Sequence, residues 1–322
     1  MWSVGGHTVA DGLGWRKWLP QPGTGGTTVV TVEHKHAEVT VIDARVRLPA
    51  DLRPRPDLAD GHYERYAEVL GLDESLVKTR AQLEAELDAT GVDHAVVHAE
   101  YEHGDVADAL NEAVAEMVAD GAGRYTGVGT VSVDSPFPGR MVGQARRCVE
   151  LGLRGVNVQP AFFGRAIDDA ELWPLYAAAE ELGLVVGLHT GVNYERVAPI
   201  DGEQPWRLDR VAAAFPDLAL CACHASWPWA TELAAVARRH PTVTFDFGGL
   251  APRYLGEPDA GWSVLMRFVD SLLVDQALYA TDWPVVTHER TLAEWAGLDL
   301  KPETRTAVMG ANAARLFGID LE

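Results

Sequence analysis

The sequence has no long apolar run, and this absence argues against a membrane-spanning protein. None of its apolar stretches approaches the roughly 18–20 residues that a membrane-spanning helix requires. The N-terminal stretch MWSVGGHTVADGLGWRKWLP contains no apolar core of the kind found in a signal peptide. We therefore expect a cytoplasmic protein that does not associate with a membrane.

Cysteines and basic residues are also scarce. The three cysteines, Cys148, Cys221 and Cys223, form neither a CxxC motif nor a disulfide framework, so we expect small buried core residues. Lys and Arg number 27 against 47 Asp and Glu, which gives a formal net charge of −20. Because binding to nucleic-acid phosphates requires a basic surface, nucleic acid is not an expected partner.

The composition is that of a soluble globular protein. Of 322 residues, 47% are hydrophobic and 23% are charged. Residues 1–36 are rich in Gly, Trp and Pro, and we interpret them as an N-terminal extension that covers another part of the protein. His34 and His36 lie at the end of this extension, where we expect surface residues. Residues 37–322 form the expected single domain.

Strand-like and helix-like segments alternate along this domain. Short apolar runs typical of buried parallel strands cover residues 38–47, 92–99, 125–132, 153–159, 184–190, 218–225, 242–247 and 277–281. Amphipathic helical patterns lie between them, for example at 107–120, 138–152 and 170–183. This alternation predicts an α/β protein with a closed (β/α)8 TIM barrel. An open doubly wound sheet is the alternative, but no glycine-rich phosphate loop follows an early strand.

The helix expected over 170–183 shows how local signals set its ends. Asp168 and Asp169 precede it as good N-cap residues, and Gly183 stands in the position that often terminates a helix. Pro174 lies inside the pattern, so we expect the helix to begin later than residue 170 or to be distorted there.

Polar side chains occur where the expected strands end, which is where barrel enzymes carry their chemistry. The residues at these ends are Asp43, Arg45, Arg47, His98, Glu100, Ser132, Asp134, Asn157, Gln159, His189, His224, Asp246 and Asp282. Strand alternation places His189 on one face with Val185 and Gly187, and His224 on one face with Leu220 and Ala222. We expect both histidines to point into the barrel. Asp246 would either join them or satisfy backbone groups of the following Gly-Gly turn.

The first expected strand, VIDARVRLPA (41–50), is unusual because it carries two arginines. Alternation puts Asp43, Arg45 and Arg47 on one face, and Ile42, Ala44, Val46 and Leu48 on the other. The second face is apolar and can be buried. The first face would direct two permanent cations toward the polar end of the barrel.

Five motifs in this order resemble those of the amidohydrolase-related proteins of the amidohydrolase superfamily. They are VIDARVRLP (41–49), GLRGVNVQP (152–160) with DDAELWPLYAAAEELGLVVGLHTG (168–191), FPDLALCACHAS (215–226), LYATDWPV (278–285) and MGANAARLFGI (309–319). The group includes aminocarboxymuconate-semialdehyde decarboxylase, resorcylate-type decarboxylases, and lactonases of sugar acids and pyrone dicarboxylates. The resemblance runs from about residue 38 to the end, and it is compatible with a homodimer.

The resemblance also implies roles for individual residues. In that family the first strand reads Ile-Asp-x-His-x-His, and its two histidines hold a divalent metal, often zinc, with a fifth-strand histidine and an eighth-strand aspartate. His189 and Asp282 match these last two ligands by position, and His224 matches a sixth-strand histidine that handles protons. The histidine pair is replaced here by Arg45 and Arg47.

Arginine cannot take over the task of a histidine ligand. Its guanidinium has no lone pair for a metal and stays protonated at accessible pH. At about 4 Å and an effective dielectric near 20, two like unit charges repel by roughly 4 kcal/mol. We therefore expect no metal cofactor; if a metal is bound after all, we expect zinc at His189 and Asp282.

Our leading hypothesis is a metal-independent hydrolase of a small anionic lactone, ester or amide. Arg45 and Arg47 would bind a substrate carboxylate or stabilise an oxyanion. His224 or Asp282 would activate water or move a proton, and His189 would position the substrate. We also expect Asp282 to be ionised and to pair with one of the arginines.

We expect the side-chain amides of Asn157 and Gln159 to orient the substrate.

The sequence leaves two other functions open. The alternative reaction is non-oxidative decarboxylation of a small aromatic or unsaturated acid, with His224 as the proton donor; the family's decarboxylases bind substrate through metal, which counts against it. The other alternative is a catalytically silent barrel in which an arginine–aspartate salt bridge fills the metal position and the site binds an anionic ligand or a partner protein.

Overall fold

The computed structural model describes residues 39–54, 77–99, 106–135, 137–193 and 199–320. The predicted N-terminal extension, residues 1–36, lies outside this part of the chain, as do His34, His36 and Glu100. No helix among the described residues is both long enough and apolar enough to cross a membrane.

Eight short parallel strands form the centre of the domain. They are β1 (Ile42–Arg47), β2 (His94–His98), β3 (Tyr125–Val128), β4 (Gly155–Val158), β5 (Val185–His189), β6 (Leu220–Cys223), β7 (Val243–Asp246) and β8 (Ala277–Leu278). Each lies inside a segment that the sequence predicted as a strand, and each is shorter than that segment. The strands pair in the orders β1-β2-β3 and β4-β5-β6-β7-β8.

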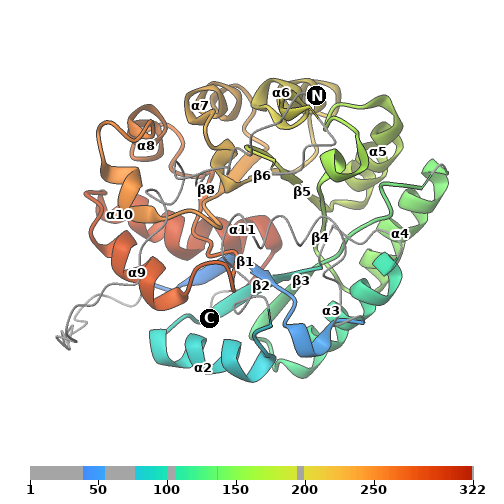
Figure 1. Ribbon diagram of the computed structural model, residues 1–322, viewed down its shortest axis with the longest axis horizontal. Coiled ribbons are helices and arrows are strands. Elements are labelled where there is room, and N and C mark those ends of the chain that lie inside the picture. The colour runs from blue at the N-terminus through green and yellow to red at the C-terminus, as the bar shows by residue number, and fades with distance from the viewer. Residues whose placement is uncertain (1–38, 55–76, 100–105, 136, 194–198, 321–322) are drawn as a thin grey trace, which may run out of the picture. The chain divides into compact units, whose positions relative to one another are not determined.

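Two seams join these sheets into a closed barrel. Gly129 bridges to Val156 between β3 and β4, and Val46 bridges to Trp283 beyond β8. The second seam is reinforced by the backbone hydrogen bond from Asp282 N to Arg45 O, 2.9 Å long. The predicted TIM barrel is confirmed, and Figure 1 shows the strands enclosed by the helices.

Helices follow the strands and pack outside them. They are α2 (Arg80–Thr90), α3 (Ala107–Asp120), α4 (Pro138–Glu150), α5 (Trp173–Leu182), α6 (Pro205–Ala214), α7 (Ala230–Arg239), α8 (Ser263–Val269), α9 (His288–Ala296), α10 (Pro302–Thr306) and α11 (Asn312–Phe317). As expected from Pro174, α5 begins only at Trp173, after a 3-10 turn that Asp169 caps. Gly183 ends it in the left-handed conformation, with φ 66°.

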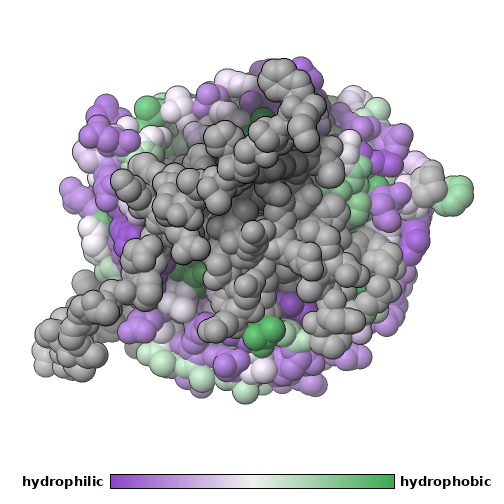
Figure 2. Space-filling view, viewed as in Figure 1, coloured by the Kyte–Doolittle hydropathy of each residue, from purple (hydrophilic) through white to green (hydrophobic). Residues whose placement is uncertain are grey.

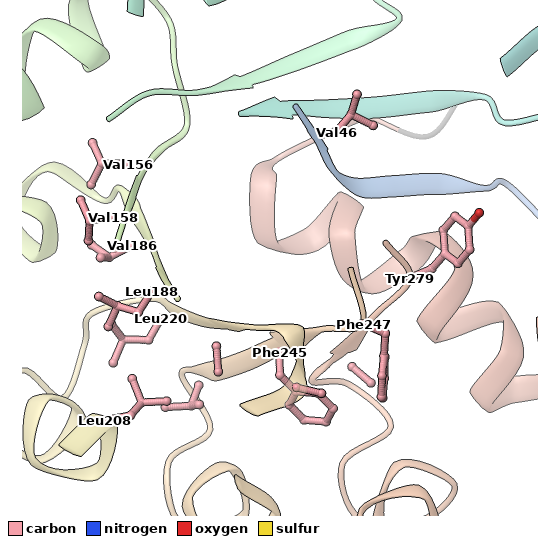
Figure 3. Close-up of a cluster of buried hydrophobic side chains, with 14 of the residues drawn as sticks. Val46, Val156, Val158, Val186, Leu188, Leu208, Leu220, Phe245, Phe247 and Tyr279 are labelled. Atoms are coloured by element: carbon pink, nitrogen blue, oxygen red, sulfur yellow. The ribbon is translucent and has the colours of Figure 1, made fainter. Parts of the chain in front are cut away.

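Apolar side chains form two separate layers. The larger layer lies between the strands and the surrounding helices, and Figure 3 shows part of it, including Val158, Leu188 and Leu220 from strands and Leu208 from α6. The smaller layer fills the barrel interior beside α11, with members such as Ile42, Ala44, Val96, Val128, Val185, Cys221, Leu278 and Phe317. Each fully buried Leu, Val or Ile contributes about 1.5–3 kcal/mol. The polar site occupies the part of the interior that this smaller layer leaves.

On the face shown in Figure 2, the surface of the described residues is mostly hydrophilic, as expected from the composition of a globular protein. Apolar residues are scattered over it. Individual exposed apolar side chains such as Phe137, which is 71% exposed, are normal for a globular protein.

Candidate functional site

Polar side chains from six strands and their following turns are buried together at one end of the barrel. Each of the following is at most 6% exposed: Arg45, Arg47, His98, Asn157, Gln159, His189, Asp246 and Asp282. Burying so many polar groups is unfavourable unless they are paired, so their contacts define the site.

Arg45 and Asp246 form the first buried ion pair of the site. Its Nε donates to Asp246 Oδ2 at 2.9 Å, and its two Nη atoms donate to Asn157 Oδ1 at 3.4 and 3.5 Å. Nη2 also contacts Cys223 Sγ. Asn157 was predicted to orient a substrate, and in the structure its amide oxygen accepts from Arg45. The guanidinium therefore directs its donors to protein groups on three other strands.

The charges of this pair stabilise each other. Burial alone lowers the pKa of Arg45, but the charge of Asp246 raises it well above its usual value. Burial raises the pKa of Asp246, and the Arg45 charge and hydrogen bond lower it to about 2. The other oxygen of Asp246 accepts from the backbone N–H of His224 at 3.2 Å and of Gly248 at 2.9 Å. Asp246 thus serves both the site and the Gly-Gly turn.

Two glycines provide the space for Arg45. A Cβ at Gly187 would lie 2.9 Å from Asn157 Oδ1, and one at Gly248 would lie 3.0 Å from Arg45 Cδ. Any larger residue at Gly187 would displace the amide that accepts from the guanidinium.

Arg47 and Asp282 form the second pair. Arg47 Nε lies 3.2 Å from Asp282 Oδ1, and Nη2 lies 3.2 Å from Oδ2, a bidentate arrangement. Asp282 adopts a left-handed backbone conformation, with φ 55°, just after β8. The predicted pairing of Asp282 with an arginine is confirmed. Two guanidinium groups and two carboxylates, each buried, give this part of the site a formal charge of zero.

This arrangement does not fit the metal that the family motif implies. Arg45 and Arg47 supply no lone pair, and both oxygens of Asp282, the retained aspartate ligand by position, accept from Arg47. A cation at about 2.0–2.2 Å from these oxygens would have to share them with a guanidinium. The zinc site considered for His189 and Asp282 would require the pair to break.

The two histidines lie together on the other side of the site. Their ring centroids are 4.9 Å apart in an edge-to-face arrangement. His189 Nδ1 lies 3.0 Å from Oε1 of Glu203, whose side chain is 1% exposed. Glu203 belongs to a 3-10 turn, Ile200–Glu203, in the loop before α6. Glu203 could not be predicted from the sequence, because nothing in a long loop indicates which acid returns to the barrel.

His224 has one fixed nitrogen and one open nitrogen. Its Nδ1 donates to the carbonyl of Gly248 at 2.7 Å, which leaves the lone pair on Nε2 in the neutral ring. Nε2 makes no hydrogen bond within the described part of the chain. Burial and then the neighbouring His189 lower the pKa of His224 to about 4. The ring is therefore a neutral base at physiological pH.

The backbone directs the His224 side chain into the site in a way that strand alternation did not predict. Strand β6 ends at Cys223, and His224 has φ 59°, so alternation does not decide its direction. The face of Leu220 and Ala222 packs against the helices, and the interior face carries Cys221 and Cys223. The expectation that His224 shares a face with Leu220 is wrong; the left-handed turn aims the ring instead. All three cysteines are buried and unpaired, as expected.

Strand β1 also departs from simple alternation. Its pairing with β2 shifts register between Asp43 and Val46, as at a β-bulge. Asp43 contacts His288 of α9 at 3.0 Å, whereas Arg45 and Arg47 reach the site. The prediction that these three residues share a face holds for the arginines and is wrong for Asp43.

Gln159 and His98 complete the buried set. Gln159 is 2% exposed, and its side chain makes no hydrogen bond among the residues that the structure describes. Its role in binding substrate stays a prediction. His98 Nε2 donates to Ala44 O at 3.0 Å, and burial and Arg45 lower its pKa to about 3. His98 is therefore a neutral part of the barrel wall.

A family model described as amidohydrolase matches residues 42–319, well over half of the chain. A 2-amino-3-carboxymuconate-6-semialdehyde decarboxylase from Dictyostelium discoideum is 31% identical over 86 residues, which are 26% of this chain. That match spans only 23% of the length of the curated relative.

Solved structures share the barrel. An uncharacterized TIM-barrel protein from Bordetella bronchiseptica has a TM-score of 0.70 and 26% identity, covering 87% of this chain and 98% of its own. A 5-carboxyvanillate decarboxylase from Novosphingobium aromaticivorans, in complex with manganese and 4-hydroxy-3-methoxy-5-nitrobenzoic acid, has a TM-score of 0.65. It is 18% identical and covers 87% of this chain and 96% of its own, so its likeness concerns the fold alone.

Proposed function

Because the chain belongs to the amidohydrolase family, we propose that it is a metal-independent hydrolase of a small lactone, ester or amide that carries an anionic group. The observation that carries this proposal is the state of His224. Its Nδ1 is held by Gly248 O at 2.7 Å, and its pKa of about 4 leaves Nε2 as an unprotonated base at neutral pH. Hydrolysis needs such a base to activate water.

In the proposed hydrolysis, His224 transfers one proton from water to the leaving group. His224 Nε2 takes a proton from water as the water oxygen attacks the substrate carbonyl carbon. The carbonyl oxygen becomes an oxyanion, and Arg47, at the end of β1, stabilises it by charge. When the tetrahedral intermediate collapses, the bond to the leaving oxygen or nitrogen breaks, and His224 Nε2–H returns the proton to that atom. No net proton is gained or lost by the site.

The remaining polar groups have supporting roles in this proposal. Glu203 beside Nδ1 keeps His189 in one orientation next to His224. Gln159, whose side chain makes no hydrogen bond within the described part of the chain, would hydrogen-bond the substrate. Arg45 donates to Asp246 and Asn157 and so keeps these two side chains in place. It acts on the substrate only through its charge. This differs from the substrate clamp that the sequence suggested for both arginines.

A decarboxylase is the second candidate, and the names of two similar proteins support it. The Dictyostelium relative and the manganese-bound structural neighbour are both decarboxylases by name. Protonating a substrate carbon requires an acid, whereas a His224 with a pKa of about 4 carries little proton at pH 7. A decarboxylase built on His224 would therefore be most active at acidic pH, and a hydrolase above pH 5.

The test is a substrate panel assayed across pH. Carboxylated lactones, esters and amides are assayed for acid release in the presence of a chelator, and aromatic acids for carbon dioxide release with added manganese. We expect chelator-resistant acid release that H224Q lowers about 10²–10⁴-fold, while H240Q, at a partly buried position outside the site, has no effect. Carbon dioxide release that depends on manganese would replace hydrolysis by decarboxylation.

A further inference from the structure

A second group of charged side chains, two of them fully buried, lies outside the site, between β1, α2 and α9. Its centre is His288, the first residue of α9, whose side chain is 0% exposed. His288 Nε2 lies 3.0 Å from Asp43 Oδ2, and Nδ1 lies 3.4 Å from Glu86 Oε2. Each ring nitrogen therefore faces a carboxylate, and only an imidazolium has an N–H on both nitrogens. The surroundings of His288 match its charged form.

The pKa values agree with this geometry. Burial lowers the pKa of His288, but Asp43 and Glu86 outweigh it and raise the pKa to about 9. For Glu86, burial raises the pKa, whereas His288 and Lys78 lower it to about 2. Lys78 Nζ lies 2.6 Å from Glu86 Oε1. Lys78, Glu86, His288 and Asp43 thus form a row of alternating charge that sums to zero.

Asp43 connects this row to the site. Its Oδ1 accepts the backbone N–H of Arg45 at 3.0 Å and of Thr281 at 3.1 Å. Its Oδ2 accepts the Thr281 hydroxyl at 2.5 Å. Thr281 directly precedes Asp282, and Asp282 N donates to Arg45 O. One buried carboxylate therefore fixes the backbone of the two segments that present Arg45 and Asp282.

We propose that protonated His288 is a positioning residue: it holds Asp43, and through Asp43 it sets the backbone from which Arg45 and Asp282 form their ion pairs. Without the charge on His288, Asp43 would be a fully buried carboxylate with no cation beside it, which is strongly unfavourable. This inference does not depend on the reaction that the site performs.

The pH dependence follows from a raised pKa. His288 has an ordinary pKa of 6.5 and a folded value of about 9, so its contribution is fully present below pH 6.5 and is lost as the pH rises through 9. Among the described residues, the charged groups that face His288 are Asp43 from β1 and Glu86 from α2, with Lys78 behind Glu86. The pKa of Glu86 is lowered to about 2, so its charge does not change over that range, whereas that of His288 does.

The first measurement uses the unaltered protein. Carbon-13 and nitrogen-15 spectra follow the His288 ring and the Nε–Cζ groups of Arg45 and Arg47 from pH 6 to 10.5. We expect the ring to titrate near pH 9 and the arginine signals to shift with the same midpoint. A ring that is already neutral at pH 7 would overturn the proposal, as would arginine signals that do not respond when His288 titrates.

The second measurement uses H288Q at pH 7 and well below its unfolding temperature, with H240Q as the control. His240 also pairs with an aspartate, Asp209, at 2.7 Å, but it precedes β7, at the end of that strand away from Asp246. H288Q should displace the Arg45 and Arg47 signals and abolish their pH 9 midpoint, and H240Q should change neither. A merely stabilising histidine would lower the unfolding temperature and leave these signals of the folded protein in place, which would contradict positioning.

Discussion

Arg47 meets Asp282 through two parallel contacts, Nε to Oδ1 and Nη2 to Oδ2, each 3.2 Å long. Asp282 stands where the family motif has a metal-binding aspartate, and Arg47 stands where it has a histidine ligand. The guanidinium therefore occupies both oxygens of the retained ligand. Together with the Arg45–Asp246 pair, this places a guanidinium group beside each of two buried carboxylates of the site.

Breaking the Arg47–Asp282 pair should lower the free energy of unfolding. The R47M variant leaves Asp282 as a buried charge without this partner, and we expect the free energy of unfolding to fall by about 3–5 kcal/mol. Adding D282N removes the stranded charge and keeps a residue type that tolerates the left-handed backbone of position 282, so the double variant should be more stable than R47M. Urea denaturation measures both.

The Arg124–Asp88 pair is a matched control for that cycle. Its atoms are 2.6 Å apart, but its side chains are 28% and 68% exposed, so R124M should cost less than about 1 kcal/mol. A loss in R47M as small as that in R124M would show that the buried pair contributes no more than a surface pair.

Glu203 should affect turnover through His189. Replacing it by glutamine keeps the size of the side chain but removes the carboxylate 3.0 Å from His189 Nδ1. We expect E203Q to lower kcat about tenfold to a hundredfold and to change KM much less, since substrate contacts are retained. Steady-state kinetics on a substrate from the panel measures this. E171Q, at an exposed position, is the control; equal effects of the two variants would remove Glu203 from the site.

Acid should destabilise the protein partly through His98. The pKa of His98 falls from 6.5 to about 3 because burial and Arg45 disfavour its charged form. The unfolded chain therefore takes up a proton between these values and the folded protein does not, so stability is present above pH 6.5 and is lost as the pH falls. This histidine should contribute a slope of about 1.4 kcal/mol per pH unit, and the slope should decrease by that amount in H98Q. Denaturation at several pH values measures it; an unchanged slope would contradict the buried neutral ring.

The sequence predicted the features that depend on local pattern. Eight apolar runs marked the strands, Pro174 delayed the start of α5, and Gly183 ended it. The pairing of Asp282 with an arginine could also be predicted, because a buried carboxylate beside a permanent cation has few alternatives.

The features that depend on backbone irregularity could not be predicted in this way. A register shift in β1 turns Asp43 toward His288, and a left-handed turn after β6 aims His224. Both break the period of two on which the face assignments rested. Glu203 belongs to a loop, and its contact with His189 exists only because tertiary structure returns that loop to the barrel.

The most direct test of the central claim is the metal content of the purified protein after growth in zinc- and manganese-supplemented medium, measured by mass spectrometry. The variant R45H/R47H, which restores both histidines of the family motif, is prepared in parallel. We predict well under one equivalent of metal in the unaltered protein and a clear increase in the variant. A full equivalent of zinc or manganese in the unaltered protein, lost in D282N, would contradict the account.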